Sequence, residues 1–269
     1  MAVGDPAAPE HRAQMPGRRI PRVSVVGDAR AERQPETHVH RRPLLAVCGL
    51  CGGAGASTLA YLVALAEASG GRGSVLLGDT GGPSGGVAAY AGVESPRSLV
   101  EAAEHVAAGL PTGQLVAIAR DGVRVLATGP RFTPECARAG VELLLDHARA
   151  RYGLTVIDCG TLAREADQIA LERASHVAWM LPATVGAIRR ARRVLEAINP
   201  YLLGGELIVA RPDGRERKAP LDELRRLAER RRAALVLLPT LPDLATANAT
   251  AALRIAQVSL QAIRGALAR

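Results

Sequence analysis

A glycine-rich segment, residues 52–58, carries the clearest chemical pattern in the chain. It reads Gly-Gly-Ala-Gly-Ala-Ser-Thr and stands between an apolar run at residues 44–48 and an apolar helical pattern at residues 59–66. A strand, a glycine loop and a helix in this order form a phosphate cradle, because glycines let backbone N–H groups approach an anion and the helix N-terminus adds positive dipole. The candidate phosphate-binding residues are Gly52, Gly53, Ala54, Gly55, Ala56, Ser57 and Thr58.

One departure from the usual form of this loop governs the functional interpretation. The common pattern is G-x-x-x-x-G-K-[ST], whose lysine reaches the β- and γ-phosphates of a nucleotide. Here Ala56 occupies the lysine position, while Ser57 keeps the hydroxyl that meets Mg²⁺. The 34 basic residues are 33 arginines and Lys218, so an arginine from elsewhere would have to replace the missing charge. We therefore expect binding of ATP and Mg²⁺ to be weak or absent, and the plainer alternative is a glycine turn that binds nothing.

Two carboxylates stand at the ends of predicted strands. The apolar run at residues 74–78 closes on Asp79, and the run at residues 154–158 ends in Asp158. In a parallel sheet the carboxyl ends of the strands share one edge, where acids facing a phosphate loop organise Mg²⁺. The predicted Mg²⁺ set is therefore Ser57, Asp79 and Asp158, and the two acids are also the candidates for catalysis if the protein is active.

The order of the predicted elements indicates an α/β fold. Apolar strands alternate with helical patterns from residue 43 onward, which predicts a doubly wound, mostly parallel sheet with helices on both faces. Two strand-like runs, 115–119 and 123–127, flank an Asp-Gly pair and predict a hairpin. Residues 1–42 are rich in Pro and Arg and are expected to form a disordered basic tail, with residues 43–269 as one domain.

Composition limits the class of protein but does not identify a binding partner. Of the 269 residues 48% are hydrophobic and 2% are aromatic, so aliphatic side chains must fill the core. No apolar run approaches the roughly 20 residues of a membrane span, and the N-terminus lacks a hydrophobic signal core, so we expect a cytoplasmic protein. The net charge of +8 suits contact with nucleic acid or anionic lipid, but an arginine-rich composition explains it equally well.

Two helical patterns carry alternative interpretations. Four arginines, Arg189, Arg190, Arg192 and Arg193, form the densest basic patch, which would bind DNA phosphates or, as we favour, simply face solvent. The last helix repeats apolar residues at a 3-4-3-4 spacing; packing on the sheet is favoured over a membrane-surface role. Those residues are Leu253, Ala256, Leu260, Ile263 and Leu267.

The cysteines give a weaker signal. Cys48 and Cys51 form a C-x-x-C pair, but Cys48 belongs to the apolar strand and no second pair completes a metal site. We expect Cys159 to lie near Cys51 if their strands are neighbours.

Three pieces of the chain together resemble the MinD/ParA family of deviant Walker-A ATPases. They are GGAGASTLA after an apolar strand, VLLGD after the first helix and LTVID at mid-chain, and the resemblance covers residues 43–268. The piece GVRVLATGP at residues 122–130, followed by a helix and YGLTVID, is similar to the CpaE/TadZ branch. Actinobacterial CpaE-like and septum-site-determining-like proteins, which share a lysine-free GGAGAST loop, are the most similar.

This resemblance implies a role in placing cellular machinery. It suggests Tad pilus or secretion machinery, or the division septum, with protein partners from that apparatus, a homodimer, and a cytoplasmic location at a pole or septum. Peripheral membrane contact is a further implication. The alternative is an active ATP-hydrolysing ATPase of chromosome partitioning that binds DNA without sequence specificity.

Four departures from the family pattern all fall on nucleotide handling. The lysine that crosses the family's dimer interface is Cys51 here, and the loop lysine is Ala56. The second acid of the family's D-x-D element is Gly81, and the adenine-contacting Asn is replaced by Ala210 and Arg211. Each lost charge removes stabilisation from the transition state, so we expect a degenerate site with very weak or absent ATP hydrolysis.

Overall fold

The computed structural model describes residues 42–71, 73–80, 86–93, 98–111, 113, 115–119, 121–127, 137–198, 204–212, 220–242, 244 and 249–268. The tail predicted at residues 1–42 lies outside these ranges except for Arg42, as do Gly81 and Cys136. Within them, no helix is long and apolar enough to cross a membrane.

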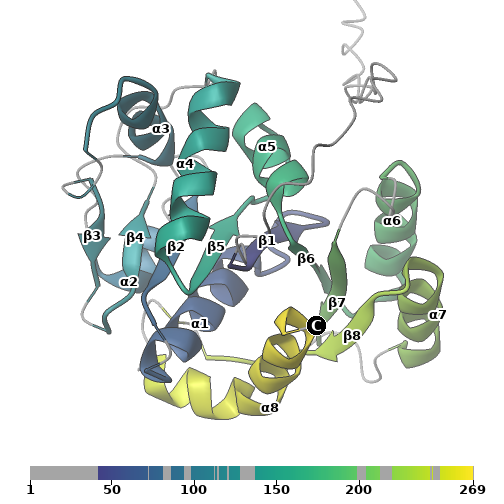
Figure 1. The fold of residues 1–269 in the computed structure, drawn as a ribbon. Coiled ribbons are helices and arrows are strands. Elements are labelled where there is room, and N and C mark those ends of the chain that lie inside the picture. The colour runs from purple at the N-terminus through teal and green to yellow at the C-terminus, as the bar shows by residue number, and fades with distance from the viewer. Residues whose placement is uncertain are drawn as a thin grey trace, which may run out of the picture. The chain divides into compact units, whose positions relative to one another are not determined.

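Strands and helices alternate along the described chain (Figure 1). The strands are β1 (Leu44–Gly49), β2 (Val75–Asp79), β3 (Ala117–Ile118), β4 (Arg124–Leu126), β5 (Leu154–Asp158), β6 (His176–Pro182), β7 (Gly205–Arg211) and β8 (Ala234–Leu237). The helices are α1 (Ala56–Ser69), α2 (Gly86–Ala91), α3 (Leu99–Ala107), α4 (Arg138–Arg151), α5 (Glu165–Arg173), α6 (Val185–Glu196), α7 (Leu221–Arg231) and α8 (Ala249–Leu267).

The strands form one eight-stranded sheet in the order β3-β4-β2-β5-β1-β6-β7-β8. All pairs are parallel except β3 with β4, which make the antiparallel hairpin that the Asp-Gly pair predicts. The predicted α/β fold with a mostly parallel sheet is therefore confirmed. β1 lies at the centre, so the loop that follows it emerges at the middle of the sheet's carboxyl edge (Figure 1).

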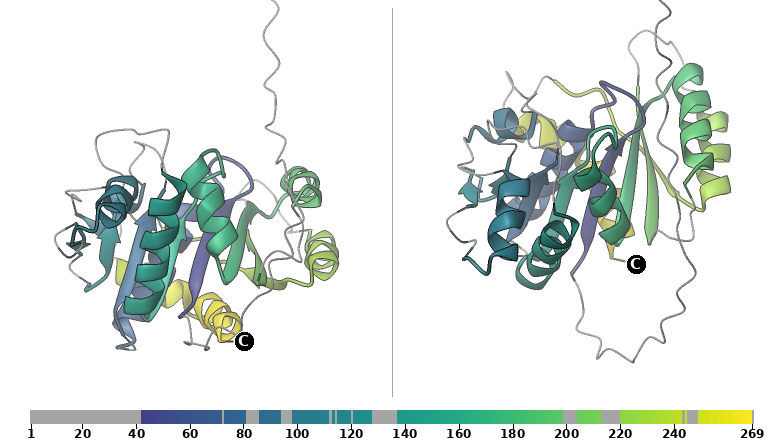
Figure 2. Two further views of the ribbon diagram at one scale, coloured as in Figure 1. Left: turned by 45° about the horizontal axis from the view of Figure 1, so that its top comes forward. Right: turned by 90° about the horizontal axis from the view of Figure 1, so that it is seen from above.

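Helices cover both faces of the sheet (Figure 2). The side chains of β1 alternate between these two helical layers. Leu45 and Val47 pack with α1, α2 and α8, whereas Leu44, Ala46 and Cys48 pack with α3 to α7. All five are fully buried, because a parallel strand covered by helices on both faces has no solvent-facing side. The alternation also fixes which side chains at the ends of the strands point toward α1.

The last helix packs on this core, as favoured from its spacing. Ala256, Leu260 and Ile263 of α8 are buried in the cluster that contains α1, and Arg264 forms an ion pair with Glu67 of α1. α2, by contrast, was not predicted: it is one and a half turns long and follows a Gly/Pro-rich stretch that masks its weak helical pattern.

A buried ion pair fastens α7 and α6 to the sheet. Arg231 donates from Nη2 to Oε1 of Glu206 at 2.6 Å and from Nε to Oε2 at 3.0 Å. Its Nη1 donates to the carbonyl oxygens of Leu195 and Ile198 at 3.0 and 2.7 Å. Trp179 in β6 donates its indole N–H to the same Glu206 carboxylate at 3.0 Å. Five hydrogen bonds thus converge where two strands and the end of α6 meet.

Candidate functional site

The glycine loop leaves β1 and turns into α1 through two residues in the left-handed region. Gly53 has φ 70° and Gly55 has φ 99°, conformations that favour glycine because a Cβ would be strained there. The backbone N–H groups of Gly52, Gly53 and Gly55 donate to no backbone acceptor among the described residues. The first turn of α1 carries no acidic side chain, so its unpaired N–H groups retain their positive potential. The loop therefore presents unpaired donors and positive potential, which favour an anion.

Ser57, in the first turn of α1, reaches the end of β5. Its hydroxyl makes a side-chain hydrogen bond with Asp158, whose Oδ1 also accepts from the backbone N–H of Gly160 at 3.1 Å. Burial raises the pKa of Asp158 above its ordinary value, and the hydrogen bonds from Ser57 and Gly160 and the charge of Arg164 partly oppose that rise. A serine of the loop and the acid at the end of β5 thus meet directly.

Asp79 lies beside Asp158, because the two residues are opposite each other in the register of β2 and β5. Both are almost fully buried. Each stands two residues after a strand residue, Leu77 or Val156, whose side chain packs in the cluster that contains α1. The structure therefore places Ser57, Asp79 and Asp158 at one point of the sheet edge. Their convergence fits the chemistry of Mg²⁺ bound with a phosphate, where one or two carboxylates and a hydroxyl complete the coordination.

A third buried acid, Asp167, was not identified as a site residue from the sequence. It belongs to the first turn of α5, where Oδ2 accepts from the backbone N–H of Arg164 at 3.0 Å and Oδ1 has no partner. Burial raises the pKa of Asp167, against hydrogen bonds from Thr80 and Arg164. Arg164 also donates to the carbonyl oxygen of Thr80, directly after β2. This arginine therefore ties the start of α5 to the end of β2.

α2 lies against the start of α1. A Cβ on Gly86 would come within 3.1 Å of both Cβ and Oγ of Ser57, so no larger residue fits there without movement. Four residues on, the hydroxyl of Tyr90 lies 3.4 Å from that of Thr58. A substituent on Ser57 or a ligand that approached it would therefore meet α2.

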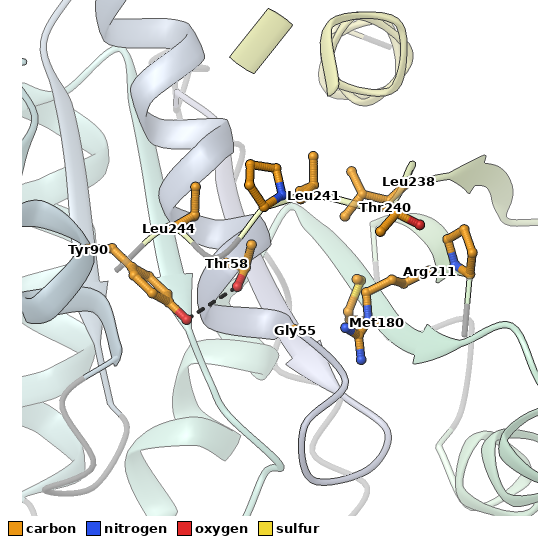
Figure 3. Close-up of a pocket in the computed structure, with 11 residues that line it drawn as sticks. Gly55, Thr58, Tyr90, Met180, Arg211, Leu238, Thr240, Leu241 and Leu244 are labelled. Atoms are coloured by element: carbon orange, nitrogen blue, oxygen red, sulfur yellow. Dashed lines mark hydrogen bonds between the residues drawn. The ribbon is translucent and has the colours of Figure 1, made fainter. Parts of the chain in front are cut away.

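A pocket of ≈ 220 Å³ opens beside the loop (Figure 3). Gly55 and Thr58 form its loop wall, and Arg211 and Met180 stand at the ends of β7 and β6. Its remaining wall is mostly apolar and comes from Tyr90 of α2, from Pro212 and from the segment after β8. That segment contributes Leu238, Thr240, Leu241, Pro242 and Leu244.

Arg211 joins this pocket to the glycine loop. Its Nη2 donates to the carbonyl oxygen of Gly53 at 2.9 Å, and its Cδ and Nε lie 3.8 Å from the position that a Cβ would take on Gly55. Nε is buried and has no hydrogen-bond partner. In the sequence, Arg211 was noted only as part of the replacement for the family's adenine-contacting asparagine. Strand alternation is the signal that could have found it, because Leu207 and Val209 of β7 also face α1.

Two of the cysteines meet in the core. Cys159, directly after β5, interacts with Cys48 of the neighbouring strand β1. The hydrogen bond with Cys48, together with burial, raises the pKa of the Cys159 thiol well above its ordinary value. Both residues are fully buried, so they act as small core side chains. No described cluster of three or more His, Cys, Asp or Glu residues could hold a metal ion.

Comparison with known proteins identifies the fold. No family model and no curated protein matches the chain. A ParA family ATPase from Chlorobium tepidum is 15% identical with a TM-score of 0.66, over 84% of this chain and 96% of its own. MinD in the MinC:MinD cell division complex of Aquifex aeolicus is 13% identical with a TM-score of 0.64, over 84% and 96%.

A third structure extends the range of functions on this fold. Cobyrinic acid a,c-diamide synthase from Mycobacterium smegmatis, with bound ATP analogue and magnesium, is 19% identical with a TM-score of 0.60, over 83% of this chain and 94% of its own. Identities this low establish a shared fold, the mostly parallel sheet of the ParA and MinD ATPases, and the chain covers nearly all of it. What the site does must be argued from its own residues.

Proposed function

We propose that this chain is a cellular positioning protein of the MinD/ParA kind, closest to the CpaE/TadZ branch, with a degenerate nucleotide site. It would act through protein partners of a Tad-type pilus or secretion apparatus or of the division septum, at a pole or septum. The observation that carries the proposal is the phosphate loop without a lysine, set on the ParA/MinD fold with Ser57 and Asp158 hydrogen-bonded at its mouth.

Residues 52–58 would hold the phosphates, and Ser57, Asp158 and Asp79 would hold Mg²⁺. ATP, when bound, supplies a triphosphate whose hydrolysis switches proteins of this fold between two states. Ala56 and Cys51 offer no charge to that triphosphate, and Gly81 offers no acid to orient water. Loss of one preorganised charge costs about 3–4 kcal/mol of transition-state stabilisation. The chain would therefore hydrolyse ATP very slowly or not at all.

The direct test is calorimetric titration of the purified protein with ATP and ADP, with and without Mg²⁺, beside an Ala56→Lys variant. Micromolar binding of Mg-ATP by the natural protein would show that the switch survives, and ATP-driven dimers would then be sought. Binding only by Ala56→Lys would show a fold used as a scaffold. A turnover comparable to that of lysine-containing relatives and abolished by Asp158→Ala would contradict the proposed degeneracy.

A second candidate function is non-specific DNA binding by a partition ATPase. The observation in its favour is an arginine-rich surface on α6 and α7, which lie side by side (Figure 1). Six exposed arginines there form no ion pair with a described residue. They are Arg189, Arg190, Arg193, Arg226, Arg230 and Arg232.

This candidate makes a prediction about salt. Duplex DNA binding that depends on several phosphate contacts must weaken steeply as salt rises. Replacing Arg189, Arg190 and Arg193 together by Ala would reduce that slope by about three if all three contact phosphates. Absent or salt-insensitive binding in fluorescence anisotropy would remove the candidate.

A further inference from the structure

We propose that Arg211 supplies the positive charge that the loop lacks, and that its guanidinium binds a phosphate group held by residues 52–58. The inference rests on the proposed nucleotide site and names the residue that gives this site its remaining affinity. The positive charge would then come from an arginine at the end of β7, and not from a lysine in the loop.

The position of the guanidinium is the first argument. Nη2 of Arg211 already donates to Gly53, and Nε lies beside Gly55 without an acceptor (Figure 3). The loop amides of Gly52, Gly53 and Gly55 likewise donate to no described backbone acceptor. Donors from the loop and from Arg211 therefore stand next to one another, and a phosphate with several acceptor oxygens can satisfy both.

Charge is the second argument. Arg211 forms no ion pair with a described residue, although its side chain is half-buried at the pocket. Nε of Arg211 is buried without a partner while its Nη2 bond to Gly53 is exposed, and an anion at this cation would form a charge-assisted hydrogen bond. The acids of the site cannot serve, because Asp158 and Asp79 lie on β5 and β2, with β1 and β6 between them and β7. An anion that entered the loop would be the partner of this arginine.

The other arginine described near the loop has a different role. Arg164 donates to the Thr80 carbonyl, and its charge acts on Asp158 and Asp167. It is therefore offset by two buried carboxylates on the β2 and β5 side. Arg211 lies on the opposite side of the loop, at the wall that opens into the pocket.

A purely structural role is the rival explanation, in which Arg211 only anchors the Gly53 carbonyl. Arg211→Gln removes the charge and keeps a neutral amide donor that is about two bonds shorter than the guanidinium. Restoration of binding by Ala56→Lys in the Arg211→Ala background separates the two roles, because a lysine in the loop replaces the charge and not the bond to Gly53. Arg211→Ala removes both functions. Arg225→Ala on α7 is the matched control, since it removes one exposed positive charge that the candidate DNA-binding surface does not include.

The experiment is calorimetric titration of Mg-ATP and Mg-ADP into the natural protein, these three variants and the double variant Ala56→Lys/Arg211→Ala, with circular dichroism to confirm folding. We expect Arg211→Ala and Arg211→Gln to weaken binding about 10- to 100-fold, the range for a hydrogen bond to a charged group. Arg225→Ala should leave binding unchanged, and the lysine of the double variant should restore it.

The contrary outcomes separate the inference from the proposed function. Equal affinity of the natural protein and Arg211→Ala would refute the role of Arg211 while leaving the nucleotide site intact. Full affinity in Arg211→Gln with loss in Arg211→Ala would show an anchor and overturn the inference. No binding by the natural protein would also overturn it, and no binding by Ala56→Lys as well would overturn the nucleotide site itself.

Discussion

Replacing Arg231 by Ala should destabilise the protein more than any single change on its surface. Arg231 has a side chain only 8% exposed, and its partner Glu206 is 3% exposed. The substitution removes both hydrogen bonds to the carboxylate and both to the carbonyl oxygens of Leu195 and Ile198. Among the described residues, the indole N–H of Trp179 would be the donor left to Glu206.

The size of the effect follows from the charge left behind. Breaking one side of a buried ion pair costs about 3–5 kcal/mol, because the remaining charge is desolvated without compensation. For a domain of this size each kcal/mol lowers Tm by about 2–4 °C, so the expected loss is about 6–20 °C. The double variant Glu206→Met/Arg231→Met should recover much of this loss, since no buried charge remains.

Urea and thermal unfolding followed by circular dichroism measure this loss. Arg225→Ala is the matched control on the same helix: its ion pair with Asp222 is 62% and 78% exposed, and its removal should cost less than about 0.5 kcal/mol. A loss below about 1 kcal/mol for Arg231→Ala, or a double variant as unstable as the single one, would refute the reasoning.

Further predictions concern titration and packing. Because burial raises the pKa of Asp158, its ionisation in the folded state opposes folding above the ordinary value of 3.8. Asp158→Asn should therefore increase the free energy of unfolding at pH 7 and lose that advantage near pH 4; an equal difference at both pH values would contradict this. Burial, followed by the charge and hydrogen bond of Asp121, raises the pKa of Tyr61 to about 12. An ultraviolet titration should lose its highest-pH tyrosine step in Tyr61→Phe and show it lowered in Asp121→Asn, and stability should fall between pH 10 and about 12. Gly140→Ala should cost about 1–3 kcal/mol in chemical unfolding, because its Cβ would lie 2.8 Å from the Ala103 carbonyl oxygen. Gly265→Ala, also in a helix but with nothing within 4 Å, should instead stabilise by about 0.5–1 kcal/mol.

Local sequence patterns were sufficient for most of the elements. The apolar run before Gly52 is β1, the Asp-Gly pair closes the β3–β4 hairpin, and the spacing in α8 does place Ala256, Leu260 and Ile263 in the core. These features depend on neighbours within one or two turns, where periodicity and turn chemistry act. α2 was missed for the same reason, since its six residues are too few to show a period.

Contacts between distant elements were predicted only in part. The sequence placed acids at the ends of two strands, and the parallel sheet did bring Asp79 and Asp158 side by side. It did not identify Cys48 as a neighbour of Cys159, because contacts between adjacent strands are set by register. Asp167 was invisible as a site residue, since only the packing of α5 reveals that its carboxylate is buried.

What the sequence determined by itself is a phosphate loop without a lysine, on an alternating α/β chain with acids at two strand ends. Those properties are local, and each is written in a few consecutive residues. What the tertiary structure decided is which residues meet at the loop. The hydroxyl of Ser57 forms a hydrogen bond with Asp158, Gly86 lies against Ser57, and Arg211 donates to Gly53 across 158 residues of sequence. Strand order in a doubly wound sheet does not follow chain order, so such partners are chosen by the crossovers and the register.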